Sequence, residues 1–454
     1  MADQLYFSRD TKVLIETTEG VWEMPVLDGF SFSQATNASE VTLSEMEGTG
    51  GTSRRGRRMF TDSFAPAEWS FSTYMRPFTS AGIASGTAAE KAAAQTVAKL
   101  AASVDGNHHA VEEVLWALLA GPAYYNELTD EFLAASGGTA YIEHSTASAD
   151  IDFGQSNKST LGTANIYFVM GGTEDTKTVY KLKDCVVNEA SADFDIDGIA
   201  TINWSGMGSI IEDQGATIPA ITVNEGVIAT NNFIRNRLTQ LSATRFDPTA
   251  VVVNAATQPT AAKKYKITQL GDTNWTAIGA SATPAVGEEF TVNSLSTAAS
   301  GTGTGAGQGK ARLANTYGLV LTGGNVTISN NVSFLTPETL GAVNQPIGHV
   351  TGARSVSGSF TCYLNNDTDS SAELFEDLMN DKTTVTNNFD LSFKIGGVSP
   401  NLPRVEMTML NCHVELPAHA IDDVISLETS FHALPSKIDL TDEITVKYVG
   451  RDAV

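Results

Sequence analysis

The sequence predicts a mainly β protein with a few helices (α+β), built from two similar domains in tandem and a small inserted β module. Two observations carry this prediction. Short runs of alternating apolar and polar residues recur between turn-forming segments, and this period of two is typical of half-buried strands. The stretch Ser70–Tyr74, Ser-Phe-Ser-Thr-Tyr, also returns as Ser359–Tyr363, Ser-Phe-Thr-Cys-Tyr, with further matches in the same order around it. Ordered matches of this kind indicate an internal duplication.

The matches keep one order in both halves of the chain, and the alternating pair Phe30 and Phe32 is matched with Val326 and Ile328. The six ordered matches are Phe7–Asp10 with Phe233–Asn236, Val26–Gly29 with Val320–Gly323, Ser70–Tyr74 with Ser359–Tyr363, Phe168–Gly172 with Phe393–Gly397, Cys185 with Cys412, and Trp204 with Phe431. The last two matches have the same separation in each half. We expect the core of each repeat to include its share of six aromatic residues: Phe71, Tyr74, Trp204, Phe360, Tyr363 and Phe431.

The duplication sets the predicted domain boundaries. Domain 1 covers residues 1–212, a linker covers 213–229, and domain 2 covers 230–246 and 315–454. Domain 1 is expanded around its helices at about residues 79–163. The two domains therefore share a strand framework and differ in what is added to it.

Three helices are expected. Thr87–Ser103 is rich in alanine, and His108–Ala120 carries an apolar stripe at helical spacing that Gly121-Pro122 ends. The third helix, Ser370–Asn380, begins with Ser370 and Glu373, the pattern of a capping box. Each of the last two helices follows a copy of the repeated strand.

Residues 247–314 enter domain 2 at the tip of its first hairpin, where the backbone has no ladder hydrogen bonds to lose. They are expected to form a small β module on the outer surface. Its core is predicted to consist of five apolar residues: Ile267, Trp275, Ile278, Phe290 and Val292. The low-complexity stretch Thr297–Gly309 follows as an extended loop.

The composition excludes several classes of protein. With 42% hydrophobic and 18% charged residues in 454, the chain is globular and long enough for two or three domains. A formal net charge of −24 argues against nucleic-acid binding and against binding to anionic membranes. Met1–Asp10 has no apolar signal core, and no window reaches the ~18–20 apolar residues of a membrane span. We therefore expect no secretion by the usual signal route and no membrane binding.

Three cysteines make no disulfide framework. Cys185, Cys362 and Cys412 each lie in a strand-like run, so they are expected to be buried free thiols. This is consistent with assembly in a reducing cytoplasm.

Two motifs suggest ligand binding at first, one for calcium and one for phosphate. Asp193–Gly198 matches the opening of a calcium loop, but Trp204 occupies the twelfth position, where a bidentate glutamate is required. The interleaved Phe194 and Ile196 favour a strand end with a solvated acidic face. Gly303–Gly307 lacks both the lysine and the strand–turn–helix context of a phosphate loop.

His108 and His109 form two i,i+4 pairs with Glu112 and Glu113, which is half of a metal site, but the sequence shows no further ligand cluster. An exposed helix start with acidic first-turn residues is the preferred interpretation. No Gly-x-Ser-x-Gly elbow or nucleophile–base pair was found. We therefore predict no catalytic, cofactor-binding or metal-binding residues, and no enzyme activity.

A cluster of arginines stands out in so acidic a chain. The long loop Glu45–Phe60 contains Arg54, Arg55, Arg57 and Arg58, followed by Met59 and Phe60. One interpretation is a mobile, solvated loop. The other is a loop that reaches an acidic face of another subunit, where arginine can pair bidentately with carboxylates. The corresponding loop of the second domain, Leu340–Arg354, has one arginine, so such a role is asymmetric.

The second half resembles the tail tube proteins of long-tailed bacteriophages most strongly. The residues that carry this resemblance are Thr316–Leu319 and the run that continues to Leu364, with Phe393–Gly397 and Leu416–His419. The resemblance extends over both halves, about Leu5–Trp204 and Phe233–Ser436. It implies two tail-tube-like β-barrel or sandwich domains.

In that family six tube domains form each ring, and their inner strands join into one barrel around a channel. The resemblance therefore implies a homotrimer with two domains per chain, which self-assembles into stacked rings for DNA ejection. Glu45–Phe60 and Leu340–Arg354 correspond to the loops that stack rings. The acidic charge fits a wall that repels phosphates, so viral DNA passes without specific binding.

The resemblance also implies a structural virion protein of the phage tail that is assembled in the bacterial host cytoplasm and needs no cofactor. Its partners would be further copies of itself and the terminator, baseplate or tip, and tape-measure proteins. Two alternatives remain open from the residues: a virion decoration protein or adhesin with a carbohydrate- or host-binding insert, and a β-rich carbohydrate-active enzyme that uses two carboxylates.

Overall fold

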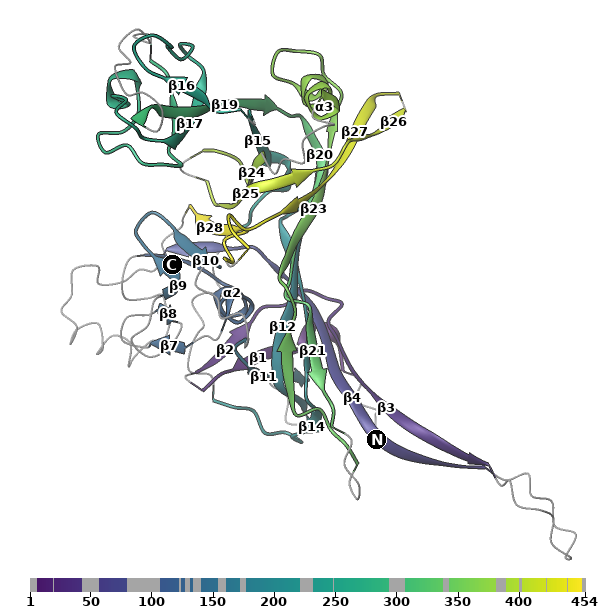
Figure 1. The fold of residues 1–454 in the computed structure, drawn as a ribbon. Coiled ribbons are helices and arrows are strands. Elements are labelled where there is room, and N and C mark those ends of the chain that lie inside the picture. Colours follow the sequence, from purple (N-terminus) through teal and green to yellow (C-terminus); the bar gives the residue numbers. More distant parts are fainter. Residues whose placement is uncertain are drawn as a thin grey trace, which may run out of the picture.

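The computed structural model of the chain confirms a mainly β fold with two α-helices in its described part (Figure 1). The described residues are 6–18, 20–42, 57–79, 107–121, 124–126, 131–133, 140–153, 161–171, 177–220, 232–247, 249–293, 307–337, 343–380, 389–399, 402–421, 423–438 and 440–450. The predicted helix Thr87–Ser103 and the residues Arg54 and Arg55 lie outside this part. No helix among the described residues is long and apolar enough to cross a membrane.

The strands of the first half pair with one another in a single antiparallel series. It contains η1 (Ser8–Asp10), β1 (Lys12–Glu16), β2 (Val21–Met24), β3 (Ser31–Thr42), β4 (Arg57–Tyr74), β11 (Ala164–Met170), β12 (Thr178–Asp195), β13 (Thr201–Gly208) and β14 (Ile211–Asp213). Antiparallel pairing runs in the order β2-β1-β11-β12-β13-β4-β3. Strand β14 pairs with Tyr180–Leu182, near the start of β12.

The second half repeats this pairing order. It contains η4 (Asn236–Leu238), β15 (Gln240–Phe246), β19 (Gly309–Gly318), β20 (Leu321–Ser329), β21 (Val332–Leu335), β22 (Gly348–Thr351), β23 (Ser355–Tyr363), α3 (Ser371–Asn380), β24 (Phe389–Ile395), β25 (Arg404–Val414), β26 (Ala418–Ile421), β27 (Ile425–Ala433) and β28 (Thr445–Val449). Its order is β19-β15-β24-β25-β27-β23-β20, with β26 continuing the edge beside β27.

Strand register corrects two of the sequence matches by two residues. Phe71 lies opposite Trp204 on the neighbouring strand, whereas Phe360 lies opposite Thr429. When the two repeated stretches are aligned, Thr429 therefore takes the place of Trp204, and Phe431 does not. In the same alignment Phe32 corresponds to Val326, because Ser31 pairs with Ser70 and Asn325 pairs with Ser359. An alternating pattern looks the same after a shift of two, so it does not fix the register.

Apart from isolated bridges, strands of the two halves pair at two places in the described part of the chain. Strand β12 pairs with β20 from Glu189–Ser329 to Asp195–Gly323, and we call this pairing the internal seam. Strand β28, near the end of the chain, pairs with β25 on one side and with β10 of the first half on the other. Figure 1 shows β28 between the two halves. One apolar core, which includes Phe194, Phe360 and Phe393, extends across the internal seam.

Where the structure describes it, the expansion of the first half consists mostly of strands. It contains β5 (Pro77–Thr79), β6 (His108–Ala110), α2 (Glu113–Ala120), β7 (Tyr124–Asn126), β8 (Glu131–Leu133), β9 (Ala140–His144) and β10 (Ala149–Asp152). The predicted helix His108–Ala120 is therefore wrong at its start, because His108–Ala110 pairs with Pro77–Thr79 as a strand. Every residue of α2 is buried, not only the predicted stripe. Trp116 packs edge-on against Trp204 with ring centroids 5.0 Å apart.

Helix α3 begins at Ser371, one residue later than predicted, and its capping differs. Glu373 accepts a hydrogen bond from the backbone N–H of Asp369 (2.8 Å), one residue before the expected partner. The hydroxyl of Ser370 donates to the carbonyl of Asn365 (2.7 Å) instead of accepting from the helix. The loop before the helix is thus fixed by the side chains that were expected to cap it.

The inserted segment has its own small core. Its elements are β16 (Val251–Val253), β17 (Lys264–Gln269), η5 (Thr276–Ile278) and β18 (Glu289–Thr291). The five predicted core residues pack together with Val253, Tyr265 and Ala311. Strand β19 pairs with β17 and β16 in the module and with β15 in the second half, so the module is continuous with the sheet.

Candidate functional site

One antiparallel sheet passes through both halves of the chain. Its strand order is β3-β4-β13-β12-β20-β23-β27-β26, and the internal seam lies at its middle. One side of this sheet covers the apolar core through residues such as Trp69, Trp204, Val326 and Phe360. The alternate residues form the opposite side, which we call the polar face.

The polar face is made by every second residue within 31–33, 68–74, 201–207, 189–195, 323–329, 355–363 and 426–432. Most of these residues are serine, threonine or asparagine. The set includes five carboxylates, Glu68, Glu189, Asp193, Asp195 and Glu428, and contains no lysine or arginine. The chain thus presents a hydroxyl-rich, negatively charged surface over both halves.

Hydrogen bonds connect neighbouring strands across the polar face. Ser31 and Ser70 are joined through their hydroxyls at 2.8 Å, and Ser191 and Thr327 at 2.9 Å across the internal seam. The hydroxyl of Ser72 donates to Oδ1 of Asn203 at 2.6 Å. Such cross-strand pairs of short polar side chains stabilise the sheet and hold its surface in one arrangement.

Asn203 links this network to the acidic residues. It donates to Oδ2 of Asp193 at 2.9 Å. Asp193 and Asp195 lie at the end of β12 and are exposed, as expected for a solvated acidic face. Trp204, the twelfth position of the calcium-loop pattern, is buried and donates Nε1–H to Thr73 Oγ1 at 2.9 Å. The calcium pattern therefore has no ligand at that position.

The sheet ends in two strand edges that have no further strand partner among the described residues. These are β3, which pairs with β4, and β26, which pairs with β27. We call them the open edges. Ile421, at the end of β26, has 79% of its surface exposed. Unpaired edges with exposed apolar residues favour pairing with another chain.

The arginine-rich loop lies on a hairpin that extends far from the body. Strands β3 and β4 project away from the body in Figure 1, and Arg57–Phe60 lies at the far end of the described part. All four side chains are exposed, with Met59 at 66% and Phe60 at 53%. Arg57 forms an exposed pair with Glu40 at 3.4 Å.

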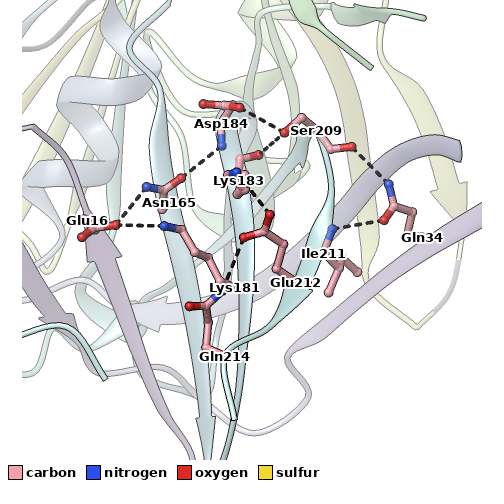
Figure 2. Close-up of polar contacts among 10 residues, drawn as sticks. All are labelled: Glu16, Gln34, Asn165, Lys181, Lys183, Asp184, Ser209, Ile211, Glu212 and Gln214. Carbon is pink, nitrogen blue, oxygen red and sulfur yellow. Dashed lines mark hydrogen bonds and ion pairs between the residues drawn. The ribbon is translucent and has the colours of Figure 1, made fainter. Parts of the chain in front are cut away.

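The base of this hairpin is anchored by Gln34. Its amide donates to the carbonyls of Ala65 (2.9 Å) and Ser209 (3.1 Å), and its oxygen accepts from the backbone N–H of Ile211 (3.1 Å). Figure 2 shows the contacts of Gln34 with Ser209 and Ile211 beside a network that includes Asn165, whose Nδ2 donates to Oε2 of Glu16 at 2.9 Å. The β3–β4 ladder shifts register directly after Gln34. Gln34 therefore fixes the point at which the hairpin leaves the sheet, a role that no sequence pattern indicated.

The matching loop of the second half is held against the first half. Asn344 forms a parallel bridge with Ser63, and its carbonyl accepts from the backbone N–H of Phe64 at 2.9 Å. Arg354 is not a free loop arginine. Its guanidinium donates to Asn330 Oδ1 (3.1 Å) and to the carbonyl of Ala120 (3.1 Å) at the end of α2.

The six predicted core aromatic residues have different environments. Phe71, Trp204, Phe360 and Phe431 are at most 2% exposed. Tyr74 is half-buried and packs edge-on against Phe233, and Tyr363 is 38% exposed. The two tyrosines occupy polar-face positions, because they alternate with the core-facing residues Thr73 and Cys362 along their strands.

The prediction for the three cysteines is confirmed, whereas the prediction for the histidine–glutamate pairs is wrong. The three thiols are free and buried, and burial raises the pKa of Cys362 to about 11, so it stays protonated. The predicted exposure of His108, His109, Glu112 and Glu113 is wrong: each is at most 4% exposed, because the strands of the expansion enclose the start of α2. The structure also adds His144, 31 residues beyond Glu113, to this group.

These features together describe a β-rich chain with a polar sheet surface and a long hairpin, and the comparisons with known proteins show what it is similar to. No family model matches the chain. The chain is, however, a homologue of a bacteriophage tail tube protein, which confirms the resemblance found in the sequence. That relative is the tail tube protein pb6 of Escherichia phage T5, 26% identical over 451 residues that cover 97% of this chain and 75% of pb6.

Proposed function

We propose that this chain is a structural, non-enzymatic protein of a phage tail, where three copies form each ring of a tube that conducts DNA. The observation that carries this proposal is the continuous sheet with a polar face and two open edges. The similarity to a tail tube protein supports it independently. The identical pairing order of the two halves supports an internal duplication, so that three chains supply six tube domains.

The internal seam provides a template for the contact between chains. Ala418 and Ala420 of β26 take the places of Ser191 and Asp193 in β12, because Asn203 pairs with Ser191 and the equivalent Glu428 pairs with Ala418. Ser31 of β3 takes the place of Asn325, since each pairs with the first serine of the repeated stretch. We therefore expect β26 of one chain to pair with β3 of the next, with Ala420 opposite Ser31.

Side-chain sizes at the internal seam also suggest how the edges fit. Phe194 is 4% exposed and covers Gly324, where an added Cβ would come within 2.9 Å of the Phe194 ring. At the open edges the equivalent residues are Ile421 and Phe30. At the internal seam the aromatic ring comes from β12, whereas at the open edges it comes from Phe30, directly before β3. Pairing of the open edges would bury the exposed side chain of Ile421.

In the closed ring, the polar face would line the channel. Each chain contributes five carboxylates to the polar face, and the polar face carries no lysine or arginine that could bind phosphates. A negative wall repels DNA, and the hydroxyl groups keep it wet, so the genome passes without being bound. The acidic channel explains why so negative a protein handles DNA.

The long β3–β4 hairpin would contact the adjacent ring. Met59 and Phe60 offer apolar contact area, and Arg57 and Arg58 offer charges for the acidic surface of a neighbour. Arg54 and Arg55 belong to the same loop. We further propose that the chain resides in the virion tail, assembles in the host cytoplasm, and contacts tail terminator, tip and tape-measure proteins.

Electron microscopy of the purified chain in negative stain tests this function. We expect rings or stacked tubes with a central channel. A population of compact monomers under all assembly conditions would contradict the proposal and would favour an adhesin or decoration protein.

A further inference from the structure

Three buried side chains from separate elements of the first half meet at one point. His109 comes from β6, Glu113 from the start of α2, and His144 from the end of β9. Oε2 of Glu113 lies 3.2 Å from Nδ1 of His109 and 3.2 Å from Nε2 of His144. Their side chains are 0%, 6% and 2% exposed, respectively. The two imidazole rings stack with centroids 4.0 Å apart.

The spacing fits a shared metal ion. Two imidazole nitrogens and one carboxylate oxygen are ligands that zinc prefers. Bonds of about 2.0–2.1 Å in a tetrahedral site place neighbouring ligand atoms roughly 3.3 Å apart, close to the two distances from Glu113. A direct charge-assisted hydrogen bond is shorter, typically about 2.7–2.9 Å. All three ligand atoms lie within 4.8 Å of one another.

The charge of the cluster points in the same direction. The carboxylate of Glu113 is 6% exposed, and its Oε2 lies between the two imidazoles. A buried anion is costly unless a positive charge lies beside it. A divalent cation bound by all three side chains would supply this charge.

We propose that His109, Glu113 and His144 bind one Zn²⁺ ion as a structural site that ties β6, α2 and β9 together. The fourth position would be taken by water or by the second oxygen of Glu113. The near-complete burial of the ligands leaves no access for a substrate, so the site is structural and not catalytic. This site is independent of the proposed tube function.

The position of the site gives it a role in joining the two halves. The adjacent Glu112 accepts a hydrogen bond from the hydroxyl of Tyr448 on β28, and Trp116 donates to the same hydroxyl at 2.8 Å. Strand β28 pairs with both β10 and β25. A metal that fixes the start of α2 would therefore stabilise the layer that holds both halves.

Metal analysis of the untagged, full-length chain tests the proposal. After dialysis against metal-free buffer, we expect about one equivalent of zinc per chain. A strong chelator should remove it and lower Tm, and added Zn²⁺ should restore Tm. The Co²⁺-substituted chain should show the visible absorption of tetrahedral cobalt.

Two variants provide the matched comparison. His144→Asn removes one ligand but keeps a polar side chain, and it should abolish zinc binding. His432→Asn alters an exposed histidine that lies 3.8 Å from Glu415, and it should leave the zinc content unchanged. If His144→Asn does not fold, the stoichiometry and the cobalt spectrum of the unaltered chain still decide.

Less than about a tenth of an equivalent of metal, with no change in Tm on adding Zn²⁺ or chelator, would overturn the proposal. The three residues would then form a hydrogen-bonded cluster without metal. Equal zinc content in the unaltered chain and in folded His144→Asn would also overturn it, because the metal would be bound elsewhere.

Discussion

Helices α2 and α3 follow the two copies of the repeated strand, yet their surroundings differ. Every residue of α2 is buried, whereas Ser371 and Leu374 are the buried residues within 371–379 of α3. The cause is the expansion of the first half, whose strands β9 and β10 cover α2 and carry β28. The same strand framework thus carries a fully covered helix in the first half and a partly exposed helix in the second.

The edges of the sheet differ in a similar way. The outer edge of β12 is paired with β20, whereas the equivalent edge of β26 has no strand partner among the described residues. In the proposed ring, one contact of this kind is made within the chain and the other would be made between chains. Substitutions in each half and at each kind of edge test how far they are equivalent.

The largest expected effect concerns the hairpin of the first half. The double variant Met59→Ser and Phe60→Ser removes the exposed apolar residues near its tip, so rings should form but should not stack into tubes. Val286→Ser, an equally exposed residue of the insert (62%), is the control and should stack normally. Electron microscopy measures the outcome, and full-length tubes from the double variant would show that the hairpin does not stack rings.

The next prediction compares Trp204 with its register equivalent, Thr429. Trp204→Ala removes a fully buried ring and its hydrogen bond to Thr73, and should lower the free energy of unfolding by about 3–5 kcal/mol. Thr429→Val replaces a buried hydroxyl that has no hydrogen-bond partner in the described structure, and should be neutral or slightly stabilising. Urea denaturation measures both. Equal losses would contradict the different packing and hydrogen bonding assigned to the two side chains.

Two adjacent glycines test the packing of the internal seam. A Cβ on Gly324 would lie 2.5 Å from the carbonyl of Ser359, whereas a Cβ on Gly323 would meet nothing closer than 3.5 Å. Gly324→Ala should therefore cost about 1–3 kcal/mol, and Gly323→Ala should cost much less. Thermal unfolding compares them, and similar melting temperatures would rule out close packing at Gly324.

A smaller effect is expected for Glu16. Burial raises its pKa, but hydrogen bonds from Tyr167 and Asn165 and the charge of Lys181 outweigh this, so the pKa lies below 4.5. The stabilisation is therefore present at neutral pH and is lost as the pH falls through the lowered pKa. Because the site is partly exposed, Glu16→Gln should cost less than about 1 kcal/mol at pH 7 and nothing at pH 2. Glu68→Gln, on the polar face, is the control for unfolding curves at both pH values. A loss that is the same at both pH values would contradict this assignment.

Removal of the insert should have the smallest effect on assembly. Phe246 pairs with Ala314 at the end of the hairpin, so residues 247–313 can be replaced by a two-residue Asn-Gly turn. The ion pair between Lys266 and Asp390 (3.0 Å) is lost, and Lys266→Ala isolates that loss. Tubes should still form. Their absence, with Lys266→Ala assembling normally, would make the module a structural part of the ring.

The sequence predicted those features that depend on local pattern. It predicted the mainly β fold and the apolar core of the insert, because alternation and a compact apolar set are visible in a single chain segment. It did not reveal Gln34 or His144, whose roles arise from contacts with distant segments. It also shifted Trp204 against Phe431 by two residues, because the turn between the paired residues Asp193 and Thr201 is two residues longer than the equivalent turn between Ala420 and Ser426.

Disulfide trapping tests the central claim, that three chains close a ring through β26 and β3, most directly. The variant Ser31→Cys with Ala420→Cys places one cysteine on each open edge, and the native cysteines are buried. Asp193→Cys with Asn325→Cys, an observed pair at the internal seam, is the intrachain control. Under mild oxidation, non-reducing electrophoresis should show a ladder that ends at three chains. A ladder that continues to six, or no crosslink while the control crosslinks, would contradict the account.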